Sequence, residues 1–413
     1  MNPKITALIL LALSFVLILR LAIHFQNIQM IPHGSEVVFE GKILNQPKVS
    51  IRGQQASLTL PNSQRITVRF LLDPILRYGD RVKISGKVEY FEAENGNLVA
   101  FMNYPQFGLV EKGTDANLIL NVRESIIKFF NSTLSPSSSS LILGITFGIK
   151  QEMPEQFYLN LQKTGLMHVV AASGMNVTMV GGFFAGFFTL FLRRQIALFA
   201  SVFGIIFYAV LAGLEPSIVR AGVMGIIVFS AQIMGRQSMA VLGLFFAGFL
   251  MLMASPGTIL DIGFQLSFLA TAGLIYIRPI FFLSSKLKTI IQKSLVGEDF
   301  VTTLSAQLAT LPILLVNFGS YSLWSVPANA FLLFTVPPLM IIGGISAVLG
   351  IIFEPLGRIT VYLALPFLLY FESIVSLLGE RITPVSIDRF PLTIIAGYYL
   401  LIAAIIIRAR YKR

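Results

Sequence analysis

The chain of 413 residues is 55% hydrophobic and only 12% charged, with a mean hydropathy of +0.78. These values exclude an ordinary soluble domain and indicate a polytopic membrane protein. The formal charge of +11 alone does not indicate nucleic-acid binding, because basic residues at helix ends also orient a membrane protein. The absence of cysteine excludes a thiolate metal site, and three histidines do not suggest a His-rich one, so we expect no metal and no cofactor.

The chain opens with an apolar stretch at residues 5–25, ITALILLALSFVLILRLAIHF. This stretch is long enough to cross a bilayer as a helix, and no small-residue cleavage site follows it. Arg20 lies near its far end, where a long basic side chain reaches the membrane surface. We therefore predict an uncleaved transmembrane anchor in residues 1–33.

Residues 34–113 differ, because polar and apolar residues alternate over short runs such as RITVRF at 65–70, and turn formers separate the runs. This pattern predicts a small antiparallel all-β domain, and roughly five strands fit an OB-like barrel. Ten basic and eight acidic residues give the region a net charge of +2, and aromatic residues recur in it. Such a mixture suits a groove that stacks single-stranded bases, although core packing is the favoured role for any one ring.

Residues 114–164 combine amphipathic and short apolar pieces. One helical stripe of residues 116–134, typical of a helix on the membrane surface, carries Leu118, Val122, Ile126, Phe129 and Phe130. Residues 141–149 are apolar but too few for an ordinary span, and residues 154–165 are amphipathic. We predict interfacial helices here, with a re-entrant element among them.

Apolar segments fill residues 165–413 and make ten spans together with the anchor. The nine segments are approximately 166–192, 196–213, 216–234, 238–254, 259–280, 301–317, 326–353, 358–379 and 391–408. Loops and ends on the side of Lys4 hold thirteen basic residues, which are Lys4, Arg193, Arg194, Arg236, Arg278, Lys286, Lys288, Lys293, Arg358, Arg408, Arg410, Lys412 and Arg413. The opposite short loops hold only Arg381 and Arg389. The positive-inside rule therefore predicts that this cell-membrane protein has both termini in the cytoplasm and its β domain on the extracytoplasmic side.

Polar residues interrupt the segment GLMHVVAASGMNVTMVGG at 165–182, which contains His168, Ser173 and Asn176. An unpaired polar side chain is costly in hydrocarbon, so these residues are expected to face other helices or water. One alternative is that small and polar residues only join helices, with Gly182 and Gly186 forming a helix contact. We favour a functional role for the cluster as a whole.

Further polar residues enter four later segments. Arg220 lies inside the segment that begins after Glu215, and either pairing with Glu215 or facing a polar path would explain it. Capping of a helix N-terminus is the simplest role of Asp261, but capping does not explain the nearby Gln265. The remaining positions of this kind are Gln307 and Asn329.

Catalytic templates fit poorly, so we expect no enzyme activity. Residues 171–174 (AASG) are similar to the GxSG of rhomboid proteases, but the first glycine is Ala171 and no histidine follows on a later helix. The sequence also lacks a GxxxxGK[ST] nucleotide-binding loop. Any step driven by ATP would thus belong to a partner protein.

Four ordered segments together resemble the ComEC family of competence proteins, the inner-membrane channels of DNA uptake in natural transformation. They are GLMHVVAASGMNV at 165–177, EPSIVRAGVMG at 215–225, DIGFQLSFLATAGL at 261–274, and SAQLATLPILLVNFG at 305–319 followed by Asn329. Their order and spacing match the family, as does an outer OB-like domain before the channel region. The resemblance covers essentially the whole chain.

The resemblance implies a channel domain in residues 165–413 that passes one DNA strand into the cytoplasm. The motif-matching positions expected along this path are His168, Ser173, Asn176, Arg220, Asp261, Gln265, Gln307 and Asn329. The implied partners are single-stranded DNA, a DNA receptor, a cytoplasmic motor and the lipid bilayer. The resemblance is also compatible with a homo-oligomer. A wet, polar or cationic lining is what a polyanion requires in a membrane.

Two departures from the family pattern limit this expectation. Many relatives carry a C-terminal metallo-β-lactamase-like domain, whereas this chain stops after its last predicted span, so we expect no nuclease activity. The second histidine of the family's S-G-L-H is Asn176 here, which puts any role of that imidazole in doubt. Two other functions stay open, a membrane-anchored scaffold whose OB-like domain binds a protein or glycan, and a secondary transporter for a small solute.

Overall fold

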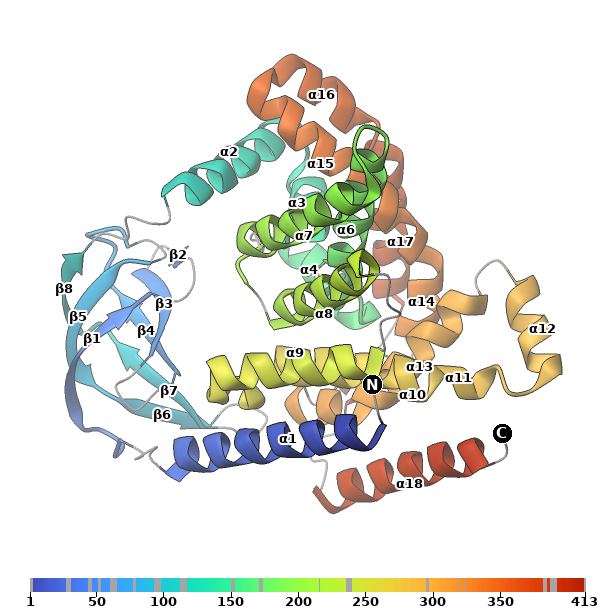
Figure 1. The fold of residues 1–413 in the computed structure, drawn as a ribbon. Helices are drawn as coiled ribbons and strands as arrows, with labels where there is room; N and C mark the ends of the chain where they lie inside the picture. Colours follow the sequence, from blue (N-terminus) through green and yellow to red (C-terminus); the bar gives the residue numbers. More distant parts are fainter. Residues whose placement is uncertain are drawn as a thin grey trace. The chain divides into compact units, whose positions relative to one another are not determined.

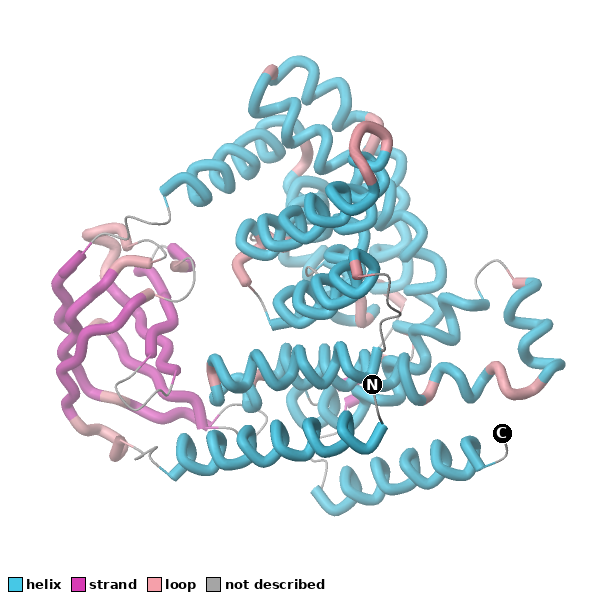
Figure 2. Tube along the Cα trace, in the orientation of Figure 1, coloured by secondary structure: helices cyan, strands magenta, loops and turns pink. Residues whose placement is uncertain are grey.

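The computed structural model is mostly helical, with a small β region (Figures 1 and 2). It describes residues 3–26, 31–43, 47–50, 53–59, 65–76, 79–92, 98–111, 117–149, 153–170, 174–214, 216–234, 240–294, 297–318, 320–322, 324–381, 385–386 and 392–411. The chain forms two compact units. The first comprises Met1–Val122 with Leu252–Ile259, and the second comprises Arg123–Met251 with Leu260–Arg413.

The first unit contains helix α1 (Pro3–Gln26) and the β region. The strands of the β region are β1 (Glu36–Lys42), β2 (Lys48–Ser50), β3 (Gly53–Thr59), β4 (Arg65–Phe70), β5 (Arg81–Lys87), β6 (Glu89–Glu92), β7 (Leu98–Asn103) and β8 (Gln106–Glu111). They form a three-stranded sheet in the order β1-β5-β8 and a five-stranded sheet in the order β2-β3-β4-β7-β6. The all-antiparallel expectation was wrong for one pair, because β4 and β7 are parallel, with β5 and β6 providing the crossover that parallel pairing needs.

The alternating pattern of the β region gives it one apolar core. In β4, Ile66, Val68 and Phe70 are buried, while Thr67 and Arg69 between them are more exposed. The same core takes Leu58 from β3 and other buried residues from both sheets. Period-two alternation therefore places the inward residues as the sequence predicts.

The second unit is helical, and helices α6, α7 and α8 pack against one another in it (Figure 1). Its helices are α2 (Asn117–Thr133, whose first turns belong to the first unit), α3 (Pro136–Phe147), α4 (Glu155–Thr164), α5 (Met167–Val170), α6 (Gly174–Thr189), α7 (Arg194–Leu211), α8 (Pro216–Ile233), α9 (Ala240–Ala254, whose end belongs to the first unit), α10 (Ile262–Tyr276), α11 (Arg278–Phe281), α12 (Ser285–Lys293), α13 (Gly297–Phe318), α14 (Ser325–Leu332), α15 (Val336–Ile352), α16 (Glu354–Tyr362), α17 (Leu365–Gly379) and α18 (Leu392–Tyr411). Two short strands, β9 (Ser320–Tyr321) and β10 (Val385–Ser386), pair antiparallel.

Seven helical stretches in the described part of the chain are long and apolar enough to cross a membrane, which fits a polytopic membrane protein. An eighth would be α16 with α17, which pass the same test together but are bent by 50°. Two shorter apolar helices, Ala240–Ala254 and Thr393–Ala409, complete the ten segments expected from the sequence. That the chain crosses the membrane ten times stays a prediction.

The glycine contact considered from the sequence is not used among the described residues. A Cβ added to Gly182 or Gly186 would meet no atom within 4 Å. A Cβ on Gly181 would instead lie 2.8 Å from Phe229 and 2.9 Å from Ile205. The close approach of α6 to its neighbours therefore uses the adjacent face of the helix, because one residue rotates the contact by about 100°.

Helix α3 is short and enclosed. All residues from Ser138 to Phe147 are buried, and the Thr146 hydroxyl donates to the carbonyl of Leu339 at 3.4 Å. At the other end, the Ser138 hydroxyl donates to Oε1 of Glu372 at 2.5 Å. Helices α15 and α17 thus pack around α3, which with 12 residues is too short to span the membrane.

Candidate functional site

A first group of polar side chains joins α5, α13 and α14, and we call it the histidine cluster (Gly165, His168, Gln307, Ser325 and Asn329). His168 Nδ1 lies 2.9 Å from the Gly165 carbonyl oxygen, and Nε2 lies 3.3 Å from Asn329 Nδ2. Gln307 Nε2 donates to the Ser325 hydroxyl at 2.8 Å, one helical turn before Asn329. Three of the residues predicted from the sequence are therefore brought together.

The backbone of this cluster depends on Gly165, which ends α4. Its φ of 72° lies in the left-handed region, and its N–H donates to the Gln162 carbonyl, as in a helix C-cap. A Cβ at this position would lie 2.7 Å from the Ser325 Cβ. Both the turn and the approach of α14 therefore require glycine, and the turn directs the Gly165 carbonyl toward His168.

Hydrogen-bonding groups face both nitrogens of the imidazole. Nδ1 faces the carbonyl oxygen of Gly165, and Nε2 faces the side-chain amide of Asn329. Asn329 is 1% exposed, and its Oδ1 has no partner in the described part of the chain. The His168 side chain, in contrast, is exposed, so the cluster joins a buried amide to an accessible ring.

A second group, the arginine cluster (Gly174, Arg220, Ser267 and Thr271), joins α6, α8 and α10. Arg220 Nε donates to the Ser267 hydroxyl at 2.7 Å, and Nη1 donates to the Thr271 hydroxyl and lies 3.5 Å from the Met224 sulfur. The Arg220 residue is only 8% exposed. A Cβ on Gly174 would lie 3.0 Å from Nη2, so that nitrogen lies close to the backbone of α6 at Gly174.

Arg220 forms no ion pair among the described residues. Glu215, the acidic partner considered from the sequence, lies outside the described residues. The hydroxyl and thioether groups around the guanidinium are neutral, so they hold it in place without offsetting its charge.

Asn176 and Asp261 have structural partners. Asn176 is buried, and its Nδ2 donates to the Ile145 carbonyl at 2.6 Å, near the end of α3 where helical carbonyls lack intrahelical donors. Asp261 is the N-cap of α10 and accepts from the Phe264 N–H at 2.9 Å. Gln265 follows one turn later on α10, the helix that supplies Ser267 and Thr271. Ser173 lies outside the described residues.

Sequence reasoning missed Ser325, Ser267 and Thr271 as members of these clusters. A signal was present for Ser325, which lies four residues before the predicted Asn329, whereas Ser267 and Thr271 lie four residues from each other. Residues at this spacing share a helix face. A search along helix faces that begins from Asn329 would therefore have included Ser325, whereas Ser267 and Thr271 share a face with each other and not with Gln265.

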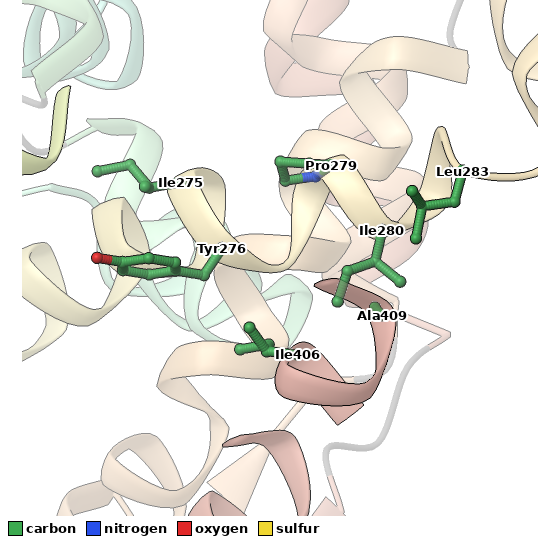
Figure 3. A pocket seen from close by; sticks show the side chains of 7 residues that line it. All are labelled: Ile275, Tyr276, Pro279, Ile280, Leu283, Ile406 and Ala409. Atoms are coloured by element: carbon green, nitrogen blue, oxygen red, sulfur yellow. The ribbon is translucent and has the colours of Figure 1, made fainter. Parts of the chain in front are cut away.

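Within the described residues, neither a metal-binding group nor the hollow shown in Figure 3 coincides with these clusters. In the ranges that the structure describes, no three His, Asp or Glu side chains gather in a way that could hold a metal ion. A hollow of about 80 Å³ lies between α10–α11 and α18 (Figure 3). It is lined by Ile275, Tyr276, Pro279, Ile280, Leu283, Ile406 and Ala409, none of which belongs to either cluster.

A family model described as "Competence protein" matches residues 145–412, more than half of the chain. The chain belongs to the Competence protein family. All eight residues predicted from the sequence lie inside the matched region, and the β region lies before it. The resemblance stated from the four sequence motifs is thereby confirmed.

The chain is also similar in sequence to one curated relative. The chain is 28% identical to ComE operon protein 3 of Bacillus subtilis (strain 168) over 279 residues, which are 67% of this chain. The match covers 34% of that relative, so the chain spans about a third of its length. No solved structure matches the chain.

Proposed function

We propose that the helical unit provides a polar path by which one strand of DNA crosses the cell membrane in natural transformation. The observation that carries this proposal is the histidine cluster, in which His168, Gln307 and Asn329 converge from distant parts of the sequence. Polar side chains are costly within apolar helices and are typical of substrate paths. Membership of the Competence protein family supports the choice of DNA as the substrate.

The topology belongs to the same proposal. Ten crossings would place both termini in the cytoplasm and the β region, as an OB-like domain that contacts DNA, on the outer side. We propose a conduit without enzyme activity of its own, which works with a DNA receptor and a cytoplasmic motor. This arrangement matches the thirteen basic residues expected on one side of the membrane.

Uptake of labelled DNA into the cytoplasm tests the path. Asn329→Leu removes an amide that contacts His168 and leaves an apolar side chain of similar size. We expect DNA entry to fall by at least about tenfold, because a change of 1.4 kcal/mol in a barrier alters a rate by that factor. DNA at the cell surface and the amount of membrane-inserted protein should stay unchanged.

Asn317→Leu is the matched control for this experiment. Asn317 is also an amide on an apolar helix, and its Nδ2 donates to the Ile313 carbonyl of its own helix. Its substitution should leave DNA entry near the wild-type rate. Equal DNA entry in wild type and Asn329→Leu would contradict the proposed path. If wild-type protein supports no DNA entry, the result would favour a transporter for a small solute or a scaffold instead.

A further inference from the structure

Glu372 is an acidic side chain in an apolar helix, and it belongs to neither cluster. It lies at the middle of α17 and is the only charged residue of that helix. Among the described residues, its carboxyl group accepts a hydrogen bond from Ser138 and forms no ion pair. A carboxylate without a cation is costly to hold away from water, and such residues in membrane helices mark functional sites, proton relays among them.

The helices that pack on α17 supply no counter-charge for this carboxyl group. Helices α3, α14 and α15 contain no charged residue. Helix α4 contains Glu155, Tyr158 and Lys163, and α17 itself contains Tyr370. Lys163, the cation of this set, forms no ion pair with Glu372 in the structure as described. Binding of a cation from solution, of which the proton is the smallest, is therefore what remains to neutralise Glu372.

Two serine hydroxyls connect this carboxyl group with the surface of the helical unit. Ser135 is exposed, and its hydroxyl donates to Ser138 Oγ at 3.0 Å. Ser138 is buried, and its hydroxyl donates in turn to Glu372 Oε1 at 2.5 Å. Each oxygen in this row lies within hydrogen-bond distance of the next, and the donors follow one another toward the carboxyl group. Such a row can pass a proton inward without movement of the backbone.

We propose that Glu372 is a proton-binding site, loaded from the surface of the helical unit through Ser135 and Ser138. A proton from water that binds Ser135 Oγ allows the Ser135 proton to pass to Ser138 and the Ser138 proton to pass to Oε1 of Glu372. Each serine ends the step with one hydroxyl proton, and the carboxylate becomes a neutral carboxylic acid. This site does not depend on which substrate crosses the helical unit, so a failure of the proposed function would leave it standing.

A hydrophobic carbodiimide is the probe for this site, because it reacts within a membrane with a protonated carboxyl group and not with a carboxylate. Glu372 is partly exposed, so the reagent can reach it. Full-length protein in lipid nanodiscs is treated with dicyclohexylcarbodiimide at a series of pH values, and mass spectrometry measures the modified peptides. We expect Glu372 to be modified at neutral pH, and its modification to decline as the pH rises and the proton is released. This measurement uses the wild-type protein, so the native fold is retained.

Glu354 is the matched control carboxyl group, since it lies on the neighbouring helix α16 and is paired with Arg358 at 2.6 Å. It should stay unmodified, because the ion pair keeps it charged. Equal modification of Glu354 and Glu372, or no modification of Glu372 at any pH, would overturn the site. Protection of Glu372 by sodium ions at constant pH would overturn the proton as its ligand in favour of a metal ion.

The row of hydroxyls has its own test, which is the rate at which the Glu372 proton exchanges with deuterium. The carbonyl stretching band of the protonated carboxyl group, assigned by its absence in Glu372→Gln, shifts when deuterium replaces the proton. Infrared spectroscopy follows this shift after transfer to heavy water. We expect Ser138→Ala to slow the exchange at least about tenfold, as a barrier higher by about 1.4 kcal/mol would.

Ser139→Ala is the control for the row of hydroxyls. Ser139 is also buried, but its hydroxyl donates to Asn131 Oδ1 at 2.6 Å and not to Glu372. Its substitution should leave the exchange at the wild-type rate. Equal exchange rates in Ser138→Ala and wild type would overturn the path through the serines.

Discussion

Gln54 is the buried polar side chain that organises the segment after β4. Its Nε2 donates to the carbonyls of Leu71 at 2.8 Å and Pro74 at 2.6 Å, and its Oε1 accepts from the Leu76 N–H at 2.9 Å. The residue is 1% exposed. A segment without regular secondary structure thereby satisfies backbone groups that strands would otherwise pair.

Replacing this side chain should loosen that segment. Gln54→Leu would leave three backbone groups without their partners, so we expect a loss of about 2–4 kcal/mol in local stability. Hydrogen exchange of peptides covering residues 65–92 in the full-length protein measures the loss. Gln55→Leu is the control, since the neighbouring residue faces the other side of β3 and is less buried, and its exchange should match wild type.

At the scale of elements, hydrogen bonds connect α18 to α13 close to a proline in α13. Pro312 lies inside α13 and has no N–H, so the Leu308 carbonyl loses its usual donor four residues later. The Tyr398 hydroxyl donates to that carbonyl at 2.8 Å, and the Tyr399 hydroxyl donates to the Ala309 carbonyl at 3.0 Å. Two adjacent tyrosines of α18 therefore satisfy the backbone next to Gln307, a member of the histidine cluster.

A double-mutant cycle tests this relation between the two helices. In the wild-type background Tyr398→Phe should lower the free energy of unfolding by about 1 kcal/mol, because one hydrogen bond is lost. In a Pro312→Ala background the alanine N–H can reach the Leu308 carbonyl, so the same substitution should cost less. Denaturant unfolding in detergent gives the four values. Additive effects would contradict the relation, and Tyr362→Phe, an exposed tyrosine of α16, is the control.

At the scale of the molecule, the absence of cysteine makes the topology directly measurable. Lys288 in α12 and Arg381 after α17 are separated by α13, by α14 with α15, and by the bent pair α16 and α17. Three crossings would place these two exposed residues on opposite sides of the membrane. The bent pair decides the result, because a re-entrant pair would return the chain to the side from which it came.

Single-cysteine variants provide the measurement. We expect Lys288→Cys to react with a membrane-impermeant maleimide only from the cytoplasmic side, and Arg381→Cys only from the outer side, because positive charge is retained inside. Lys83→Cys in the β region should react from the outer side as well. Labelling of positions 288 and 381 from the same side would show that the bent pair does not cross.

The features that could be predicted from the sequence are those that local pattern determines. Hydropathy and length located the apolar helices, and period-two alternation located the β region, because each depends on neighbouring residues only. Which polar groups meet depends on packing between distant segments, as with His168 and Asn329, which are 161 residues apart. For the same reason, local pattern does not separate Asn176, whose amide donates to a carbonyl of α3, from the members of the two clusters.

The enclosure of α3 has a consequence for the order in which the protein is assembled. Its partners come late, since Ser138 bonds a residue 234 positions further on and Thr146 bonds one 193 positions further on. During synthesis α3 is therefore made long before the helices that surround it. At about 18 Å it is also too short to cross the hydrocarbon alone. Insertion of α15 and α17 must therefore precede the burial of α3. Although α3 is synthesised before these two helices, it reaches its final position after them.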